Sequence, residues 1–153
     1  MDEIKIDLID RRILTILSHD SRATYAEIAG ELKLATATVH SRVNKLKENG
    51  VIIGSQISVD LKKLGFLVTS FIGVNCSSAK NVNDVIKKLE NFPEITDVHY
   101  TTGQYSLFVK VVTTTTQELH LFLINKLQSI KEIQSTETFI SLDHPIARPR
   151  SVS

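Results

Sequence analysis

The chain has 153 residues, of which 42% are hydrophobic and 23% charged, enough for one ordinary domain or two small ones with modest cores. Its 18 basic and 17 acidic side chains give a net charge of +1. This charge is too small for long-range electrostatic attraction of the whole protein to nucleic acid. It has no run of about 18 apolar residues and no basic, then apolar leader, so we expect a cytoplasmic protein without a membrane partner.

The first half of the chain predicts three short helices. The first follows Asp7 and ends before the polar residues 19–22. Its apolar face repeats at helical spacing in Ile9, Ile13, Ile16 and Leu17. The second begins where Thr24 and Glu27 form a T-x-x-E capping box, and its apolar positions are Ile28, Ala29 and Leu32. A break over residues 33–35 separates it from the third helix.

The third helix begins near Thr36 and carries Val39, Val43 and Leu46 on one face, a stripe that must pack against the other helices. Gly50 closes it as a left-handed cap. Rotation by about 100° per residue places small and basic polar side chains opposite the stripe and on its flanks. The resulting DNA-binding candidates are Thr36, Ala37, Thr38, His40, Ser41, Arg42, Asn44, Lys45 and Lys47.

These residue types suit the major groove of DNA. Serine and threonine bond base edges or phosphates, asparagine can bind adenine, and arginine and lysine bind guanine or phosphate oxygens. We expect base contacts from the N-terminal half of the helix and backbone contacts from Lys45 and Lys47. An ordinary solvated helix would show a similar polar face. The two preceding helices and the extended segment that follows instead predict a winged helix-turn-helix that binds double-stranded DNA.

The positive charge of this candidate reading helix is small. Residues 36–49 contain Arg42, Lys45 and Lys47 against one acid, Glu48. With so few phosphate contacts per subunit, useful affinity needs two or more reading helices on one DNA segment, because linked contacts reinforce each other. We therefore expect a homo-oligomer.

The segment after the third helix alternates apolar and polar residues. Val51, Ile53, Ile57 and Val59 predict a linking strand, which ends in a turn at residues 60–65.

From Phe66 the pattern predicts the order β-α-β-β-α-β, a ferredoxin-like arrangement with two helices on one face of a four-stranded antiparallel sheet. The expected strands are residues 66–76, 95–102, 105–113 and 133–142, and the expected helices are residues 81–92 and a helix capped by Thr115 and Glu118. The fold class is thus α+β. The expected division is a helix-turn-helix domain at 1–60, a linker at 61–65, a ferredoxin-like domain at 66–145 and a tail at 146–153.

The sheet face without helices must meet something, because it carries apolar residues such as Phe71, Leu107 or Phe108. A second copy of the chain is the simplest partner. Burying that face across a two-fold axis would join two reading helices symmetrically.

Two further segments resemble a known family. They are HYTTGQYSLFVKV, residues 99–111, and INKLQSIKEIQSTETFISL, residues 124–142. With the reading helices at the other end, they make the chain similar to the Lrp/AsnC family of feast-or-famine transcription regulators, especially its asparagine-responsive members. The resemblance covers nearly the whole chain. It implies a ligand-binding RAM domain, a dimer through the sheet faces, assembly of dimers into an octamer, and a small amino-acid effector, asparagine, bound between dimers.

The resemblance also implies which residues bind the effector: Tyr100, Thr101, Thr102, Gly103, Gln104, Tyr105, Ser106, Gln128, Gln134 and Thr136. Gly103 allows close approach of the backbone, and hydroxyl and amide groups can bond a carboxylate, an ammonium and a side-chain amide. Many family members carry an acidic residue where this chain has Ser106, and the serine favours a neutral polar effector. Alternatively, these hydroxyls only satisfy a polar hairpin edge.

The chain departs from the family pattern just before the reading helix, where members have a glycine-containing turn and a Ser-Pro-like start. Lys33 therefore occupies a turn position that suits glycine. Ala35 offers no cap, so Thr36 is a candidate for that role, which would shift the helix start by one residue.

Other functions have little support in the sequence. The five histidines show no metal-ligand spacing, and neither a glycine-rich phosphate loop nor a G-x-S-x-G motif is present. We therefore expect no metal, no cofactor and no enzymatic activity. Two alternatives stay open: an architectural DNA-binding protein without an effector, and an enzyme that resembles the tetrapyrrole decarboxylases built on the same scaffold.

Overall fold

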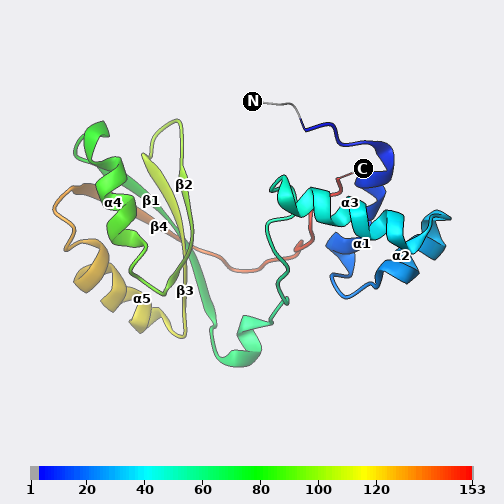
Figure 1. The fold of residues 1–153 in the computed structure, drawn as a ribbon. Coiled ribbons are helices and arrows are strands. Elements are labelled where there is room, and N and C mark those ends of the chain that lie inside the picture. The colour runs from blue at the N-terminus through cyan, green and yellow to red at the C-terminus, as the bar shows by residue number, and fades with distance from the viewer. Residues whose placement is uncertain (1–3, 153) are drawn as a thin grey trace. The chain divides into compact units, whose positions relative to one another are not determined.

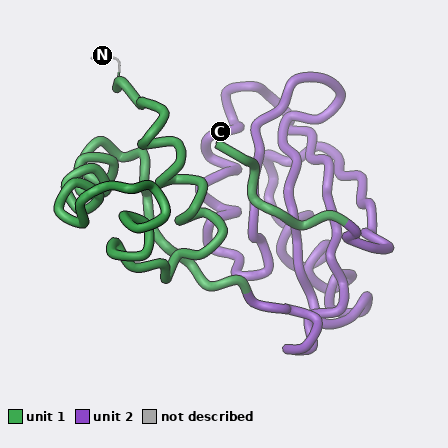
Figure 2. Tube along the Cα trace, turned by 90° about the vertical axis from the view of Figure 1, so that its right-hand side faces the viewer, with its two compact units in different colours: residues 1–58, 146–153 green, residues 59–145 purple. Residues whose placement is uncertain are grey.

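The computed structural model describes residues 4–152, which divide into two units (Figures 1 and 2). The first unit combines the chain up to Ser58 with the C-terminal segment from Ile146, and the second runs from Val59 to Pro145. Each unit has its own buried core. No helix among the described residues has the length and apolar character needed to cross a membrane.

The first unit contains the three predicted helices. They are α1 (Leu8–His19), α2 (Tyr25–Leu32) and α3 (Thr36–Glu48). Their buried side chains come from all three helices and form one cluster of Ile13, Ile28, Ala29, Val39 and Val43. The apolar spacing in the sequence therefore gave the correct inward face of each helix.

Reciprocal hydrogen bonds define where α1 and α2 begin. At α2 the Glu27 N–H donates to Thr24 Oγ1 at 3.2 Å, and the Thr24 N–H donates to Glu27 Oε2 at 2.7 Å. This confirms the predicted capping box. At α1 the same exchange joins Asp7 and Asp10: the Asp10 N–H donates to Asp7 Oδ1, and the Asp7 N–H donates to Asp10 Oδ2.

The turn between α2 and α3 contains a left-handed lysine. Lys33 has φ 55° and ψ 49°, as expected at a position that suits glycine. The Leu34 N–H donates to the Ala29 carbonyl at 2.9 Å, which closes the last turn of α2. The expectation of a Thr36 cap was wrong: Ala35 is the N-cap of α3, without a side-chain cap, and its carbonyl accepts the first bonds of the helix.

Gly50 ends α3 in the left-handed region, with φ +69°, as predicted. The linking strand expected at residues 51–59 is absent from the described chain. Val51 is half-buried, but Ile53 and Ile57 are 95% and 77% exposed, so most of the alternating apolar side chains of this segment are uncovered. A strand needs a neighbour that pairs with its backbone groups, and the single chain supplies none here. A 3₁₀ turn, η1 (Leu61–Leu64), follows.

The second unit has the predicted ferredoxin-like topology. Its elements are β1 (Val68–Cys76), η2 (Ala79–Asn81), α4 (Val82–Leu89), β2 (Ile95–Tyr100), β3 (Leu107–Thr113), α5 (Thr116–Phe122), η3 (Leu123–Leu127) and β4 (Ile133–Ile140). The antiparallel sheet has the strand order β2-β3-β1-β4, and α4 and α5 cover one of its faces (Figure 1). The α+β fold is confirmed.

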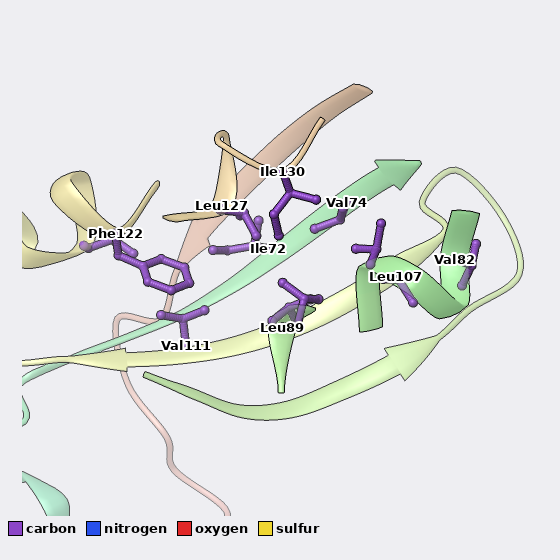
Figure 3. Close-up of a cluster of buried hydrophobic side chains, with 12 residues drawn as sticks. Ile72, Val74, Val82, Leu89, Leu107, Val111, Phe122, Leu127 and Ile130 are labelled. Atoms are coloured by element: carbon purple, nitrogen blue, oxygen red, sulfur yellow. The ribbon is translucent and has the colours of Figure 1, made fainter. Parts of the chain in front are cut away.

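The sheet has one face toward the helices and one open face. Ile72 of β1 pairs with Val109 of β3, and both are fully buried in the cluster beneath the helices. Figure 3 shows Ile72 within this cluster. Leu107 is also fully buried in that cluster, so its expected place on the open face was wrong. Successive side chains alternate between faces, which leaves Phe71 and Phe108 on the open face.

The left-handed backbone at Lys33 generates a first prediction. Replacing Lys33 with glycine removes the Cβ that this conformation disfavours, so we expect a gain of about 0.5–1 kcal/mol in unfolding free energy. Urea denaturation of the full chain, followed by circular dichroism, measures it. Lys33→Ala is the control, because it removes the charge and keeps the strain. A gain as large for alanine as for glycine would contradict the assignment of strain.

Candidate nucleic-acid interface and effector hairpin

The face of α3 opposite its buried stripe is open to solvent within the first unit. Val39, Val43 and Leu46 are at most 3% exposed. The candidates that are exposed are Thr36, Ala37, Thr38, His40, Ser41, Lys45 and Lys47, and Asn44 and Arg42 are half-buried. We call the set Ala37, Thr38, Ser41 and Lys45 the reading face. Its first three residues are small, so the helix backbone could approach the base edges in a major groove.

The start of α3 adds a feature suited to phosphate. Ala35 provides no side-chain hydrogen bond to the first turn of α3. Backbone N–H groups at an uncapped helix start carry partial positive charge and favour an anion. At the other end, Lys45 and Lys47 lie in the last turn. Both ends of the reading face can therefore accept a phosphate backbone.

One flank of the reading face packs against α2. The ring of His40 meets the ring of Tyr25 edge to face, with 5.4 Å between centroids. Asn44 Nδ2 lies 3.4 Å from His40 Nδ1, so Asn44 supports the same side chain. His40 was a candidate for DNA contact, and the structure shows that it also joins α3 to α2.

The other flank is tied to α1 by ion pairs. Arg42 Nη1 lies 2.6 Å from Asp7 Oδ2 and 2.8 Å from Asp10 Oδ1. The pKa of Asp7 lies below its ordinary value because the Asp10 backbone N–H and the Arg42 guanidinium donate to its carboxylate. The side-chain hydrogen bonds that Arg42 donates, first to Asp10 and then to Asp7, raise the pKa of Arg42. Sequence reasoning missed both acids, since their only visible signal was the D-x-x-D spacing at the start of α1.

The hairpin between β2 and β3 holds most of the effector candidates. Thr102, Gly103 and Gln104 form its exposed tip, and Gly103 has φ +103°. Apart from its two neighbours in the chain, no described residue has an atom within 4 Å of the place where a Gly103 Cβ would stand. Within this chain the glycine is therefore required by backbone conformation, whereas the expected close approach would have to come from another molecule.

Two hydroxyls of the hairpin are used within the fold. Thr101 Oγ1 donates to the Tyr105 carbonyl at 2.9 Å. Ser106 Oγ accepts from the Cys76 N–H at 3.2 Å, and the Ser106 N–H donates to the Val74 carbonyl at 2.9 Å. The Thr101 bond closes the hairpin on itself, and the two Ser106 bonds join it to β1.

Tyr105 lies on the open face of the sheet. A Cβ on Gly73 would come within 2.6 Å of the Tyr105 ring, so the ring rests directly on this glycine. Its hydroxyl donates to the Glu137 carboxylate of β4, and its ring lies 6.2 Å from that of Phe108. The Glu137 bond and burial raise the pKa of Tyr105. A glycine inside an apolar strand was the sequence signal for this contact.

The remaining effector candidates are less closely grouped. Thr136 pairs with Val74, whose carbonyl accepts from Ser106, so these two candidates lie on neighbouring positions of the sheet. Tyr100 is 70% exposed at the end of β2. Gln128 and Gln134 are exposed, and no hydrogen bond or ring contact among residues 4–152 joins either to the hairpin. The part of the chain described also holds no cluster of three metal-ligating side chains.

Comparison with known families gives two matches that together span most of the chain. A model described as winged helix-turn-helix DNA-binding matches residues 6–53. A model described as the Lrp/AsnC ligand binding domain matches residues 69–151.

Similar proteins and solved structures match nearly the whole chain. The regulatory protein AsnC of Haemophilus influenzae is 48% identical over 143 residues, 94% of this chain and 95% of that protein. AsnC of Escherichia coli K12 is 45% identical over 148 residues, 97% of each chain. The structure of E. coli AsnC has a TM-score of 0.92 and covers 96% of this chain and 99% of that one. A Neisseria meningitidis regulator described as a complex with L-Met shares the fold, with a TM-score of 0.89 at 19% identity over 94% of both chains.

The contact of Tyr105 with Gly73 generates a second prediction. We expect Gly73→Ala to lower the unfolding free energy by about 1–3 kcal/mol, because the new methyl group overlaps the ring. Removing the ring in Gly73→Ala/Tyr105→Ala should make the glycine substitution nearly neutral relative to Tyr105→Ala alone. Urea denaturation of the four proteins gives the coupling energy. Equal costs of the glycine substitution in both backgrounds would contradict the contact.

Proposed function

The chain belongs to the Lrp/AsnC family and is a DNA-binding transcription regulator of that type, and on this premise we propose that it binds operator DNA as a symmetric oligomer controlled by asparagine. The observation that carries the proposal is the exposed reading face of α3, which lies opposite a fully buried stripe. The close relatives are named regulatory proteins, so the chain is a regulator and not an enzyme. This sets aside the tetrapyrrole decarboxylase alternative.

We assign DNA contact to the reading face and to the uncapped start of α3. Thr38 and Ser41 can bond base edges or phosphates, and Lys45 and Lys47 supply positive charge for the DNA backbone. The proposed division of labour keeps residues 1–60 as the reading domain, residues 61–65 as the linker and residues 66–145 as the effector domain. The proposed place of action is the cytoplasm, the compartment that holds the DNA in the bacteria of its AsnC relatives.

The open sheet face supports a dimer. Phe71 and Phe108 stack there with 6.1 Å between ring centroids, and Phe139 of β4 lies 6.3 Å from Phe108 with 44% of its surface exposed. A row of three aromatic rings on an uncovered sheet is a surface that a second copy can bury. Two copies would bring two reading helices to one DNA segment, and further association of dimers would give the proposed octamer.

A small-molecule effector follows from the ligand-binding family of the second unit, and asparagine is our specific proposal. Ser106 and the exposed Gln104 offer neutral donors and acceptors, which suit a side-chain amide. The Neisseria structure described as an L-Met complex supports the idea that this fold can hold an amino acid. Because Gly103 is uncrowded within the chain, we place the effector between the hairpins of associated dimers. An architectural DNA-binding protein without an effector is the alternative.

Selection from a random pool of DNA duplexes tests the DNA proposal. The full chain should enrich a two-fold symmetric sequence whose half-sites lie about one helical turn, 10–10.5 base pairs, or a multiple apart. Ser41→Glu should abolish enrichment because it presents a carboxylate to the DNA. Ser21→Glu is the matched control, since Ser21 is exposed between α1 and α2 and lies outside the reading face. Enrichment of unrelated sequences, or of none, would refute sequence-specific binding.

Calorimetric titration of the full chain with asparagine, aspartate, glutamine and methionine tests the effector proposal. We expect uptake of asparagine, and a stabilisation of about 2.7 kcal/mol at a ligand concentration 100 times its dissociation constant. Gly103→Val should abolish uptake, because a β-branched residue disfavours φ +103°. Gly54→Val is the control, since Gly54 has no positive φ and no neighbour within 4 Å. Binding of none of the four would favour the architectural alternative.

A further inference from the structure

We propose that Arg42 is a positioning residue, which fixes the reading face of α3 relative to α1, and that its guanidinium makes no contact with DNA. The inference rests on the proposed DNA-binding function and changes the role that the sequence predicts for this residue.

Each carboxylate, of Asp7 and of Asp10, uses its two oxygens for different partners. Asp7 Oδ1 and Asp10 Oδ2 accept the reciprocal N–H bonds that begin α1. Their other oxygens, Asp7 Oδ2 and Asp10 Oδ1, both accept from Arg42 Nη1. The carboxylates are therefore held by the backbone of α1 before they meet the guanidinium. Arg42 is clamped by groups that cannot turn away without uncapping the helix.

Moving Arg42 onto a phosphate would break both ion pairs. The side chain of Asp10 is only 13% exposed, so its carboxylate would lose its partner in a place that water reaches poorly. The exposed Asp7 carboxylate would also lie unpaired beside the DNA. Lys45 lines the same open hollow as Asp7 and Arg42, and it makes no ion pair among residues 4–152. The reading helix thus has a cation for DNA that is separate from the cation bound to α1.

The clamp lies opposite a second anchor. His40 meets Tyr25 of α2 on one flank, while Arg42 meets α1 on the other. Ser41 lies between these two positions in the sequence and belongs to the reading face. The position of Ser41 relative to the core is therefore fixed by contacts on both flanks. A helix that bonds particular base edges needs its side chains held in such a fixed geometry.

The salt dependence of DNA binding separates positioning from contact. The probe is the duplex enriched by the full chain, with a scrambled duplex of equal length as the non-specific probe. Lys45→Gln should lower the slope of log affinity against log salt by about 0.9 for each reading helix, because a phosphate contact is lost. Arg42→Gln should leave that slope unchanged. The double variant Arg42→Gln/Asp7→Asn preserves net charge and should also keep the slope.

The specificity ratio tests whether the role goes beyond stability. With the variant shown to be folded by circular dichroism, Arg42→Gln should reduce the affinity ratio of enriched to scrambled duplex by at least about fivefold. Arg42→Lys should regain part of it, since a single nitrogen bridges both acids. Asp7→Asn is the second variant, because asparagine still caps α1 and loses the ion pair; it too should lower the ratio.

Three results would overturn the proposal: a slope that falls for Arg42→Gln as it does for Lys45→Gln, an unchanged specificity ratio in folded Arg42→Gln, or a higher ratio in Asp7→Asn. Failure of the proposed function looks different. In that case the unmodified chain enriches no duplex, so the loss appears before any variant is compared.

Discussion

Two helices can cover only one face of a four-stranded sheet, and this limit underlies the proposed assembly. α4 and α5 bury Ile72 and Val109 on one side, and the same strands carry Phe71 and Phe108 on the side left uncovered. Burial of aromatic surface is among the largest favourable contributions available to a small domain. In the proposed dimer, burial of the open sheet face would thus supply the free energy that pairs two reading domains. The exposed Ile53 and Ile57, which follow α3 in the first unit, are further apolar side chains that the single chain leaves uncovered.

The charge distribution supports the proposed pairing of subunits. The net charge is +1, and one of the three cations on α3, Arg42, is already paired with the two acids that begin α1. Few positive charges then remain for phosphate contact, so a single reading domain would gain little from electrostatic attraction. In the proposed complex, specific binding would come from base contacts made in a fixed geometry by two linked helices. The anchored flanks of α3 and the proposed symmetric partner would therefore act together, since both would set where the reading face lies.

Local patterns were sufficient for most of the fold, and non-local contacts were not visible. Capping residues and apolar spacing predicted the three helices and the βαββαβ order, because these signals lie within a few residues of each other. Leu107 was misplaced because Leu107, Phe108 and Val109 are all apolar, so alternation alone does not say which residue faces the helices. The bonds of Arg42 to α1 span 32 and 35 residues, which no periodic pattern encodes.

The hairpin proposed to bind the effector and the open sheet face share one residue, Tyr105. The backbone of Tyr105 belongs to the hairpin, and its ring lies against Gly73 while its hydroxyl donates to Glu137. The ring is therefore part of the aromatic surface that includes Phe108. A shift of the hairpin backbone must move this ring, and a closely packed neighbour must follow or lose contact. The surface proposed for subunit pairing is thus mechanically continuous with the loop proposed for the effector. In this proposal, the single side chain of Tyr105 would couple effector binding at the hairpin to subunit pairing at the open sheet face.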